Sequence, residues 1–425
     1  MKPAQSSEEV TDSHESVRKC ALLIIDGLGD LPHPELDGKT PLEAAHTPVF
    51  DRLAMTGHFG LVDPIIPGKI PNTHSGTGML MGLLPGQASR LSRGPVEASG
   101  AGRVLSSGDI AMRANFASVE SLDGELLVTD RRAGRITADT EELAAVLKDI
   151  DLGDDIFASL VPTDQHRGVL VLSGPGLNAA ISNTDPGDGK MPAPVKTCLP
   201  LKPAAALTAE KVNRFVIEAH NRLVDHPVNI ARTADGKPGA SGIITRGAGE
   251  QFKLDNVLQP LGIKAAVVTG CNTVRGLGRI FGFDAIIDPR FTATVDTDLH
   301  AKIAAVVSAL QDHELVFLHV KAPDICSHDR RPLAKRDFLQ RLDEALKPLL
   351  ETGSVIAIAA DHTTDSNSGF HTADPVPALI WQPDTTQSTV PVKFGESACR
   401  QGNMDRQLSN DFLLRVLRTM GYQPA

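Results

Sequence analysis

The stretch CALLIIDGLGD (residues 20–30) decides the fold of this chain. An unbroken apolar run that ends in Asp-Gly is typical of a strand buried on both faces, as in a parallel sheet. Similar runs recur as KAAVVTG (264–270), LVFLHV (315–320) and SVIAIAA (354–360). Amphipathic helical patterns lie between them. The alternation predicts an α/β fold with a mostly parallel sheet sandwiched by helices.

The middle of the chain has a different pattern. Short alternating runs between residues 106 and 200, such as AMRANFASV and RGVLVLSG, predict a small inserted α+β cap domain. The segment DPGDGKMPAPVKTCLPLKPAA is rich in Pro, Gly and Lys and is expected to be the exit linker. The core then comprises residues 18–105 and 201–425, with a cleft between core and cap. Residues 1–17 are polar and are expected to be a disordered lead-in.

The composition narrows the function. A formal net charge of −10, with one Trp and one Tyr among 425 residues, argues against a nucleic-acid partner. No apolar run reaches the roughly 18 residues of a membrane span, and the polar N-terminus lacks the apolar stretch of a signal peptide. Five widely spaced cysteines predict neither a disulfide framework nor a zinc knuckle. We therefore expect a cytoplasmic protein that acts on a small molecule and has no membrane partner.

Aspartate and histidine residues follow three of the apolar runs. They are Asp26, Asp324, His328, Asp361, His362 and His371. Because the carboxyl ends of parallel strands lie along one edge of a sheet, where ligands bind, we expect these side chains to converge. Carboxylate and imidazole ligands together suit Mn, Zn or a similar divalent ion. Six ligands are enough for two ions if a nucleophile oxygen completes one site.

The candidate nucleophile lies in PNTHSGTGMLMG (71–82), a Gly/Ser/Thr loop that runs into an apolar helix. Backbone N–H groups at such a helix start favour anions. A hydroxyl there can attack a phosphate once metal coordination lowers its pKa and holds it in line. The residues alone do not choose among Thr73, Ser75 and Thr77.

Several motifs in combination resemble the alkaline phosphatase superfamily, and more closely its archaeal-type cofactor-independent (2,3-bisphosphoglycerate-independent) phosphoglycerate mutases. The resemblance covers nearly all of residues 20–385. The motifs are IIDGLGD, GKTPLEAAHTP, RGPVEASGAG, GDIAMRANFASV, DRRAGRI, HVKAPDICSHD, and AADHTTDS followed by HTADPVPALI. The resemblance implies an alkaline-phosphatase-like core with an inserted cap, and two divalent metal ions (Mn, Zn or Mg).

The resemblance also implies how the ligands divide between the two ions. One ion is expected on Asp26, Thr73, Asp361 and His362. The other is expected on Asp324, His328 and His371.

The nucleophile loop departs from the pattern that it resembles. The family usually has Gly-Ser-Asp-Thr-Ala-His, with the serine attacking. Alignment on Gly82 and Pro85 puts Thr73 in place of that serine, His74 in place of the aspartate and Thr77 in place of the histidine. Threonine attacks in other branches of the superfamily, so Thr73 is expected to be the nucleophile, and the change bears on which substrate fits.

Matching stretches in and beside the cap imply contacts with the substrate. The residues are Asp130, Arg131, Arg132, Arg135, His166, Arg167, Arg246 and Arg275. An arginine fork suits carboxylate and phosphate groups. The motif RGPVEASGAG is expected to be a hinge or loop that positions the cap, with glycines for backbone freedom.

The leading hypothesis is interconversion of 3-phosphoglycerate and 2-phosphoglycerate through a phosphothreonine intermediate in a cleft that excludes water. The alternative is a metal-dependent phosphomonoesterase, phosphodiesterase or phosphonate hydrolase of the same superfamily, in which water reaches phospho-Thr73. A small-molecule phosphotransferase also fits, and a homo-oligomer is compatible with each activity. A non-catalytic binding protein is disfavoured because it would not need every metal ligand.

Overall fold

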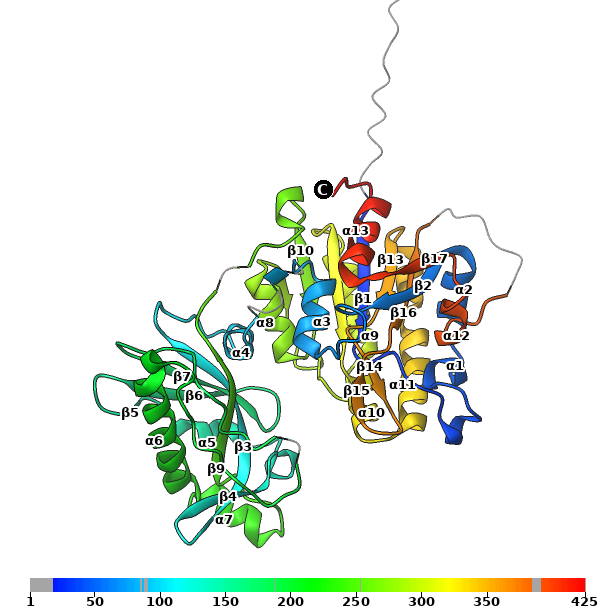
Figure 1. The fold of residues 1–425 in the computed structure, drawn as a ribbon. Coiled ribbons are helices and arrows are strands. Elements are labelled where there is room, and N and C mark those ends of the chain that lie inside the picture. Colours follow the sequence, from blue (N-terminus) through cyan, green and yellow to red (C-terminus); the bar gives the residue numbers. More distant parts are fainter. Residues whose placement is uncertain are drawn as a thin grey trace, which may run out of the picture.

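The computed structural model describes residues 18–84, 86–87, 91–187, 189–252, 254–383 and 391–424. Two large sheets organise these residues, one of eight strands and one of seven. Figure 1 shows them in two lobes side by side, with residues 110–249, drawn from cyan to green, forming the lobe that holds the smaller sheet. Within the described ranges, no helix combines the length and the apolar character needed to cross a membrane.

The larger sheet carries the predicted apolar runs at its centre. Its strand order is β11-β10-β12-β1-β13-β16-β2-β17. β1 pairs in parallel with both β12 and β13, and Ile24 lies opposite His319 and Ala359. β16 is antiparallel to its neighbours, whereas the other pairs are parallel, so the predicted mostly parallel sheet is confirmed. The strands are β1 (Cys20–Ile25), β2 (His58–Asp63), β10 (Ala265–Val268), β11 (Asp284–Ile286), β12 (Leu315–Val320), β13 (Val355–Ala359), β16 (Val376–Trp381) and β17 (Met404–Leu408).

The central strands are apolar on both faces because helices cover the sheet. Every residue of β1, β12 and β13 is buried. Their side chains belong to one continuous core together with residues of the surrounding helices. These helices are α1 (Pro41–Ala44), α2 (Pro48–Thr56), α3 (Thr73–Leu80), α8 (Asn272–Ile280), α9 (Leu299–Ala309), α10 (Ala322–His328), α11 (Pro332–Ala345), α12 (Glu396–Cys399) and α13 (Ser409–Thr419).

The smaller sheet is antiparallel and is organised around one long strand, β3. β3 pairs with β7 and β9 along its first part and with β4 along its second. A separate core lies beneath this sheet. The elements are β3 (Ile110–Leu122), β4 (Glu125–Asp130), β5 (Ile150–Asp151), β6 (Phe157–Pro162), β7 (Arg167–Ser173), β8 (Ala193–Pro194), β9 (Gly242–Gly249), α5 (Thr140–Ala145), α6 (Ala206–Leu223) and α7 (Pro227–Ala234).

The inserted unit extends further along the chain than the expected boundary at residue 200. The expected exit linker contains β8, which pairs with β4. After it, α6 contributes Val212, Phe215 and Ala219 to the core beneath the smaller sheet, and β9 pairs with β3. Strand pairing therefore favours an insertion that ends near residue 250. Local composition identified the Pro/Gly-rich segment but not the return of β9, because that pairing is a long-range contact.

The motif RGPVEASGAG forms helix α4 (Arg93–Gly100) and not the expected loop. Its glycines allow close approach and do not serve as flexible points. A Cβ atom on Gly94 would lie 1.9 Å from the carbonyl oxygen of Ala111 in β3, and one on Gly100 would lie 2.1 Å from that of Asn272 in α8. The helix thus packs, backbone against backbone, on both lobes.

A stability prediction follows from the start of α2. Asp343, on α11, accepts hydrogen bonds from the backbone N–H groups of Val49 (3.0 Å) and Phe50 (2.8 Å). The N-cap residue Thr47 makes no side-chain cap of its own. Replacing Asp343 by alanine leaves two buried donors unpaired and should lower the free energy of unfolding by about 1–3 kcal/mol. Urea titration measures this loss, and an unchanged midpoint would contradict the capping role.

A pH prediction follows from Glu396 on α12. Its carboxylate accepts hydrogen bonds from the Thr40 hydroxyl (2.6 Å) and the Asp30 N–H (3.1 Å). Burial raises the pKa of Glu396 from 4.5 to about 7. The folded state therefore holds this proton more tightly than the unfolded chain, so the contribution to stability is lost as the pH rises through about 7. In Glu396→Gln the decline of stability between about pH 5 and 8 should be shallower than in the wild type. Denaturant titrations at several pH values measure this decline. The same dependence of the free energy of unfolding on pH in both proteins would contradict the prediction.

Candidate active site

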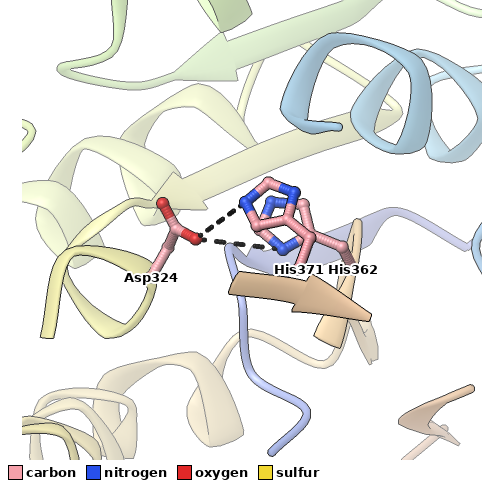
Figure 2. A group of neighbouring side chains, drawn as sticks. All are labelled: Asp324, His362 and His371. Carbon is pink, nitrogen blue, oxygen red and sulfur yellow. Dashed lines mark ion pairs between the residues drawn. The ribbon is translucent and has the colours of Figure 1, made fainter. Parts of the chain in front are cut away.

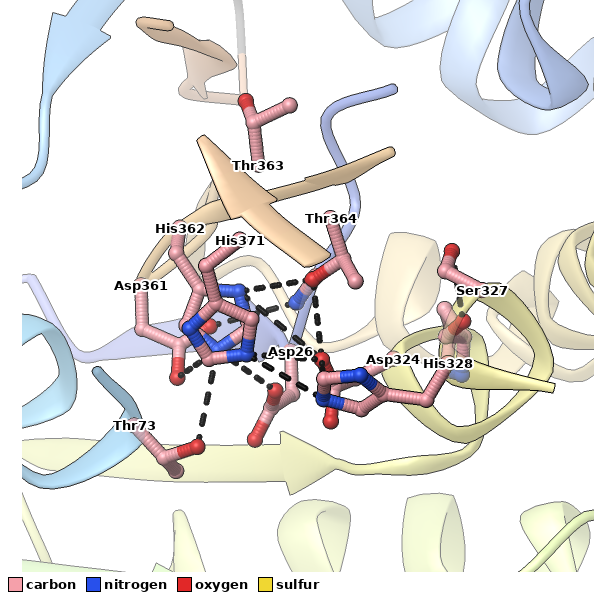
Figure 3. A network of polar contacts seen from close by, with 12 residues as sticks. Asp26, Thr73, Asp324, Ser327, His328, Asp361, His362, Thr363, Thr364 and His371 are labelled. Atoms are coloured by element: carbon pink, nitrogen blue, oxygen red, sulfur yellow. Dashed lines mark hydrogen bonds and ion pairs between the residues drawn. The ribbon is translucent and has the colours of Figure 1, made fainter. Parts of the chain in front are cut away.

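The six predicted ligands meet at the carboxyl edge of the larger sheet (Figure 3). Asp26 directly follows β1, and Asp361 and His362 follow β13 after one residue, Ala360. The other three lie on α10 after β12 (Asp324 and His328) and on the second strand of the hairpin β14 (Thr363–Asp365) and β15 (Phe370–Thr372), which carries His371. The predicted convergence is what parallel pairing of β12, β1 and β13 produces, since their ends lie at the same level.

Ligand atoms within this cluster form two overlapping groups. One group is Asp26, Asp361 and His362, and the other is Asp324, His362 and His371; within each, the atoms lie within 4.8 Å of one another. Figure 2 shows the second group, in which Asp324 Oδ1 lies 3.4 Å from His371 Nε2 and 3.9 Å from His362 Nδ1. His362 therefore reaches both groups, whereas the resemblance assigned it to one.

His328 lies beside the second group. Its Nε2 atom is 3.3 Å from Asp324 Oδ1 and 3.2 Å from His371 Nε2. Its Nδ1 atom lies 2.8 Å from the carbonyl oxygen of Gly369, so one ring nitrogen is oriented by the backbone while the other faces the cluster. This is the arrangement in which a histidine commonly ligates a metal.

Lys321 is buried in the cluster and was not identified from the sequence. Its ammonium donates to Asp26 Oδ1 (2.9 Å) and to Thr73 Oγ1 (3.0 Å), and it lies 2.7 Å from Asp324 Oδ2. A lysine directly after a buried apolar strand, three residues before a candidate ligand, was a signal that could have identified it. One ammonium does not balance three buried carboxylates, so the cluster is short of positive charge. Divalent cations would supply that charge, and the donor set fits them.

The charges in the cluster shift its pKa values in opposite directions. Burial acts to raise the pKa of Asp26, but Lys321 and hydrogen bonds from His319 and His362 hold it below its usual value. Burial and the neighbouring Asp26 raise the pKa of Asp361 well above its usual value. Burial lowers the pKa of His362 to about 4, which keeps its imidazole neutral and able to act as a ligand.

The structure distinguishes the three candidate hydroxyls. Thr73 is the first residue of α3, lines the cleft, and has its Oγ1 atom 3.5 Å from His362 Nε2. Ser75 forms the capping box of α3 with Asn72. Thr77 is fully buried and donates to Asp361 Oδ2 at 3.2 Å. Of the three, Thr73 is the one that both a substrate in the cleft and the Asp/His cluster can reach.

A cleft of about 770 Å³ lies between the cluster and the inserted unit, a volume typical of a small-molecule site. Its lining is strongly basic. The cationic side chains and His166 come from both lobes and are Arg93, Arg113, Arg131, Arg132, Arg135, His166, Arg167, Arg246, Lys321 and Arg331. Arg93 and Arg113 were not predicted, because each lies within a motif that gave no local sign of facing a ligand. Such a lining suits a small molecule with more than one anionic group.

Two of the predicted arginines make bidentate ion pairs. Arg131 donates to both carboxylate oxygens of Asp185, at 2.8 and 2.7 Å, inside the inserted unit. Arg135 donates to both oxygens of Asp329, which directly follows α10, so this pair links the two lobes at the cleft. Arg132 also lines the cleft.

Three other predicted residues also line the cleft, namely His166, Arg167 and Arg246. Arg246 lies 3.8 Å from Asp185. The Nδ1 atom of His166 and the Nε atom of Arg167 are buried and make no hydrogen bond with the described residues. Burial, followed by the charges of Arg167 and Arg113, lowers the pKa of His166 to about 2, so its ring is neutral. Buried polar atoms without a hydrogen-bond partner are suited to bind an incoming ligand.

Asp130 and Arg275 are not among the residues that line the cleft. The Asp130 carboxylate accepts from the backbone N–H groups of Arg132 and Gly134, both at 2.8 Å, and thereby shapes the DRRAGR loop. Arg275, on α8, donates to Asn272 Oδ1 at 2.7 Å. In this structure both side chains make hydrogen bonds to nearby residues of their own segments, and their contact with the substrate stays a prediction.

The mostly parallel sheet and the Asp/His cluster at its carboxyl edge define the class of protein, an α/β protein with a candidate metal site. The family model of 2,3-bisphosphoglycerate-independent phosphoglycerate mutase matches residues 54–229. Two curated relatives with that name come from Methanopyrus kandleri (41% identity, covering 95% of this chain and 96% of the relative) and Archaeoglobus fulgidus (38%, 92% and 95%). The chain belongs to the 2,3-bisphosphoglycerate-independent phosphoglycerate mutase family.

Solved structures resemble this one over its length. The cofactor-independent phosphoglycerate mutase from Thermoplasma acidophilum superimposes with a TM-score of 0.64 at 29% identity, covering 95% of this chain and all of that chain. A protein from Pyrococcus horikoshii superimposes with a TM-score of 0.77 at 30% identity, covering 96% of this chain and 99% of that chain. The two-lobed arrangement is therefore shared with other proteins.

A metal prediction tests the cluster. Asp361→Asn should reduce the bound Mn²⁺ or Zn²⁺, measured by elemental analysis. It should also stabilise the metal-stripped protein, since the raised pKa of Asp361 shows that its charge is unfavourable there. Adding metal should raise the melting temperature of the wild type more than that of the variant, since an ion at 100 times its Kd adds about 2.7 kcal/mol.

The matched control is Asp288→Asn, which removes a carboxylate paired with Arg290 outside the cleft. It should change neither metal content nor the response to metal. An Asp361→Asn protein with full metal content would show that Asp361 is not a ligand.

Proposed function

We propose that this chain interconverts 3-phosphoglycerate and 2-phosphoglycerate, and that the phosphoryl group passes through Thr73. The observation that carries the proposal is the position of the Thr73 hydroxyl. It lies where the Asp/His cluster of the core meets a cleft lined by arginines of the inserted unit. Membership of the mutase family supports the substrate pair.

Residues around Thr73 support nucleophilic attack. The Lys321 ammonium donates to Oγ1, which favours the alkoxide over the neutral hydroxyl. Thr73 also begins α3, and the first turn of a helix presents N–H groups that attract a phosphate. Two divalent ions held by the ligand groups would further lower the pKa of the hydroxyl and offset charge on the phosphoryl oxygens.

The proposed reaction has two balanced transfers. Thr73 Oγ1 loses its proton and attacks phosphorus, the bond from phosphorus to the C3 oxygen of the substrate breaks, and that oxygen takes up one proton as glycerate forms. The C2 hydroxyl of the retained glycerate then loses its proton and attacks phospho-Thr73, the bond from phosphorus to Oγ1 breaks, and Oγ1 takes up one proton to restore the hydroxyl. Arginines of the cleft would hold the carboxylate of the glycerate between the two transfers. A water molecule in place of the C2 hydroxyl would give hydrolysis.

Phosphorus NMR distinguishes these outcomes. The metal-loaded enzyme, incubated with 3-phosphoglycerate, should form 2-phosphoglycerate. Free phosphate without 2-phosphoglycerate would instead support the hydrolase alternative. Thr73→Ala should lower the rate by about a thousandfold or more, because the attacking atom is lost.

Two variants of the same helix serve as controls. Thr73→Ser keeps the hydroxyl and should retain activity. Ser75→Ala removes a capping hydroxyl that does not face the cleft and should also remain active. An active Thr73→Ala enzyme would show that another residue is the nucleophile.

A further inference from the structure

Helix α4 is the joint between the two lobes, and Glu97 is the polar residue at its centre. The Glu97 side chain is 1% exposed. On the core side it accepts from Asn272 Nδ2 (2.7 Å) and Thr273 Oγ1 (2.8 Å), which begin α8. On the side of the inserted unit it accepts from Arg113 Nη1 of β3 (3.1 Å). One carboxylate thus connects the first turn of α8 with the central strand of the smaller sheet.

The carboxylate of Glu97 is ionised and well satisfied. Burial acts to raise its pKa, but Arg113, Arg93 and the hydrogen bond from Asn272 lower it to about 2. Arg93 belongs to α4 itself, with its Nε atom 3.6 Å from Glu97 Oε1. Both arginines line the cleft. A buried charge of this kind is favourable only while all its partners are in place.

A second contact joins the same helix start to the inserted unit. The Asn272 N–H donates to Asp164 Oδ2 at 2.8 Å. Asp164 begins the turn that carries His166 and Arg167, and the Arg167 N–H closes this turn on the Asp164 carbonyl oxygen. The first turn of α8 is therefore connected at two points to elements that carry arginines of the cleft. One connection runs through Glu97 to Arg113, and the other through Asp164 to the turn that carries Arg167.

The other side of α8 leads to the nucleophile. α8 is in contact with α3, whose first residue is Thr73. A Cβ atom on Gly276 of α8 would lie 1.9 Å from the Val96 carbonyl oxygen, so α8 and α4 also touch through their backbones. The path from Thr73 to the arginines that line the cleft runs through closely packed elements with little room to shift.

We infer that Glu97 is a positioning residue. It fixes Arg93, Arg113 and Arg167, which line the cleft, relative to Thr73. Bound glycerate thereby keeps the orientation that it needs between the two transfers. This inference rests on the proposed mutase function. Glu97 makes no contact with the reacting atoms and acts through Asn272, Thr273 and Arg113. A purely structural role would affect stability alone, whereas a positioning role affects the fate of the phosphoenzyme.

The test measures how phospho-Thr73 is partitioned. Wild-type and variant enzymes, loaded with Mn²⁺, are incubated with 3-phosphoglycerate, and 2-phosphoglycerate and inorganic phosphate are quantified by phosphorus NMR. In Glu97→Gln an amide NH₂ group, which donates, replaces one oxygen that accepts. One of the contacts with Asn272, Thr273 and Arg113 is then lost, and the arginines of the cleft are no longer fixed. The ratio of inorganic phosphate to 2-phosphoglycerate should rise about tenfold or more, and kcat for the mutase reaction should fall about tenfold to a hundredfold.

A milder pair of variants keeps the test valid if Glu97→Gln does not fold. Thr273→Val removes one hydrogen bond to Glu97 and should move the ratio in the same direction, whereas Thr273→Ser keeps the hydroxyl and should behave as the wild type. Asp343→Asn is the matched control, since it alters a buried carboxylate that only caps α2. It should lower stability and leave the ratio unchanged.

The outcomes separate this inference from the proposed function. Unchanged ratios in both Glu97→Gln and Thr273→Val, in an enzyme that forms 2-phosphoglycerate, would overturn the positioning role alone. A shift of equal size in Asp343→Asn would also overturn it, because general loss of stability would then be the cause. A wild type that releases only phosphate would overturn the proposed function and this inference with it.

Discussion

The burial of three carboxylates at one edge of a parallel sheet is the constraint on which the rest of the site depends. Asp26, Asp324 and Asp361 are held there by strand ends that cannot separate without breaking the core. The energetic cost of like charges at close range is met in part by Lys321, whose ammonium contacts two of them. The same ammonium reaches Thr73, so the group that balances the charge also orients the proposed nucleophile.

The sequence allowed prediction of the elements whose signal is local. An apolar run such as LVFLHV can be recognised without knowledge of its partners, and parallel pairing then brings the six candidate ligands to one edge. Helix α4 could not be predicted, because its glycines and proline disfavour a helix and tertiary packing against β3 and α8 overrides that preference. Glu97 was missed for a related reason: its role is set by burial among residues far away in the chain, such as Asn272.

The cleft combines residues of different origin. The core contributes the Asp/His cluster and Thr73, while the inserted unit contributes most of the arginines. Arg135 and Asp329 link the lobes beside the second ligand group, and Glu97 links them at α4. In the proposed reaction, phosphoryl transfer and retention of the substrate thus belong to separate lobes. Changes in the inserted unit can alter which molecule is retained while the core keeps its chemistry.

The position of β1 in the larger sheet has a consequence for synthesis of the protein. All six residues of β1 are buried, yet both of its hydrogen-bonding partners, β12 and β13, come late in the chain. On the ribosome this apolar strand is made early and waits, unpaired, until most of the chain has emerged. An exposed strand edge of this kind invites association with other chains. The order of the strands along the chain therefore exposes this segment to association during synthesis, a consequence of topology and not of the chemistry of the site.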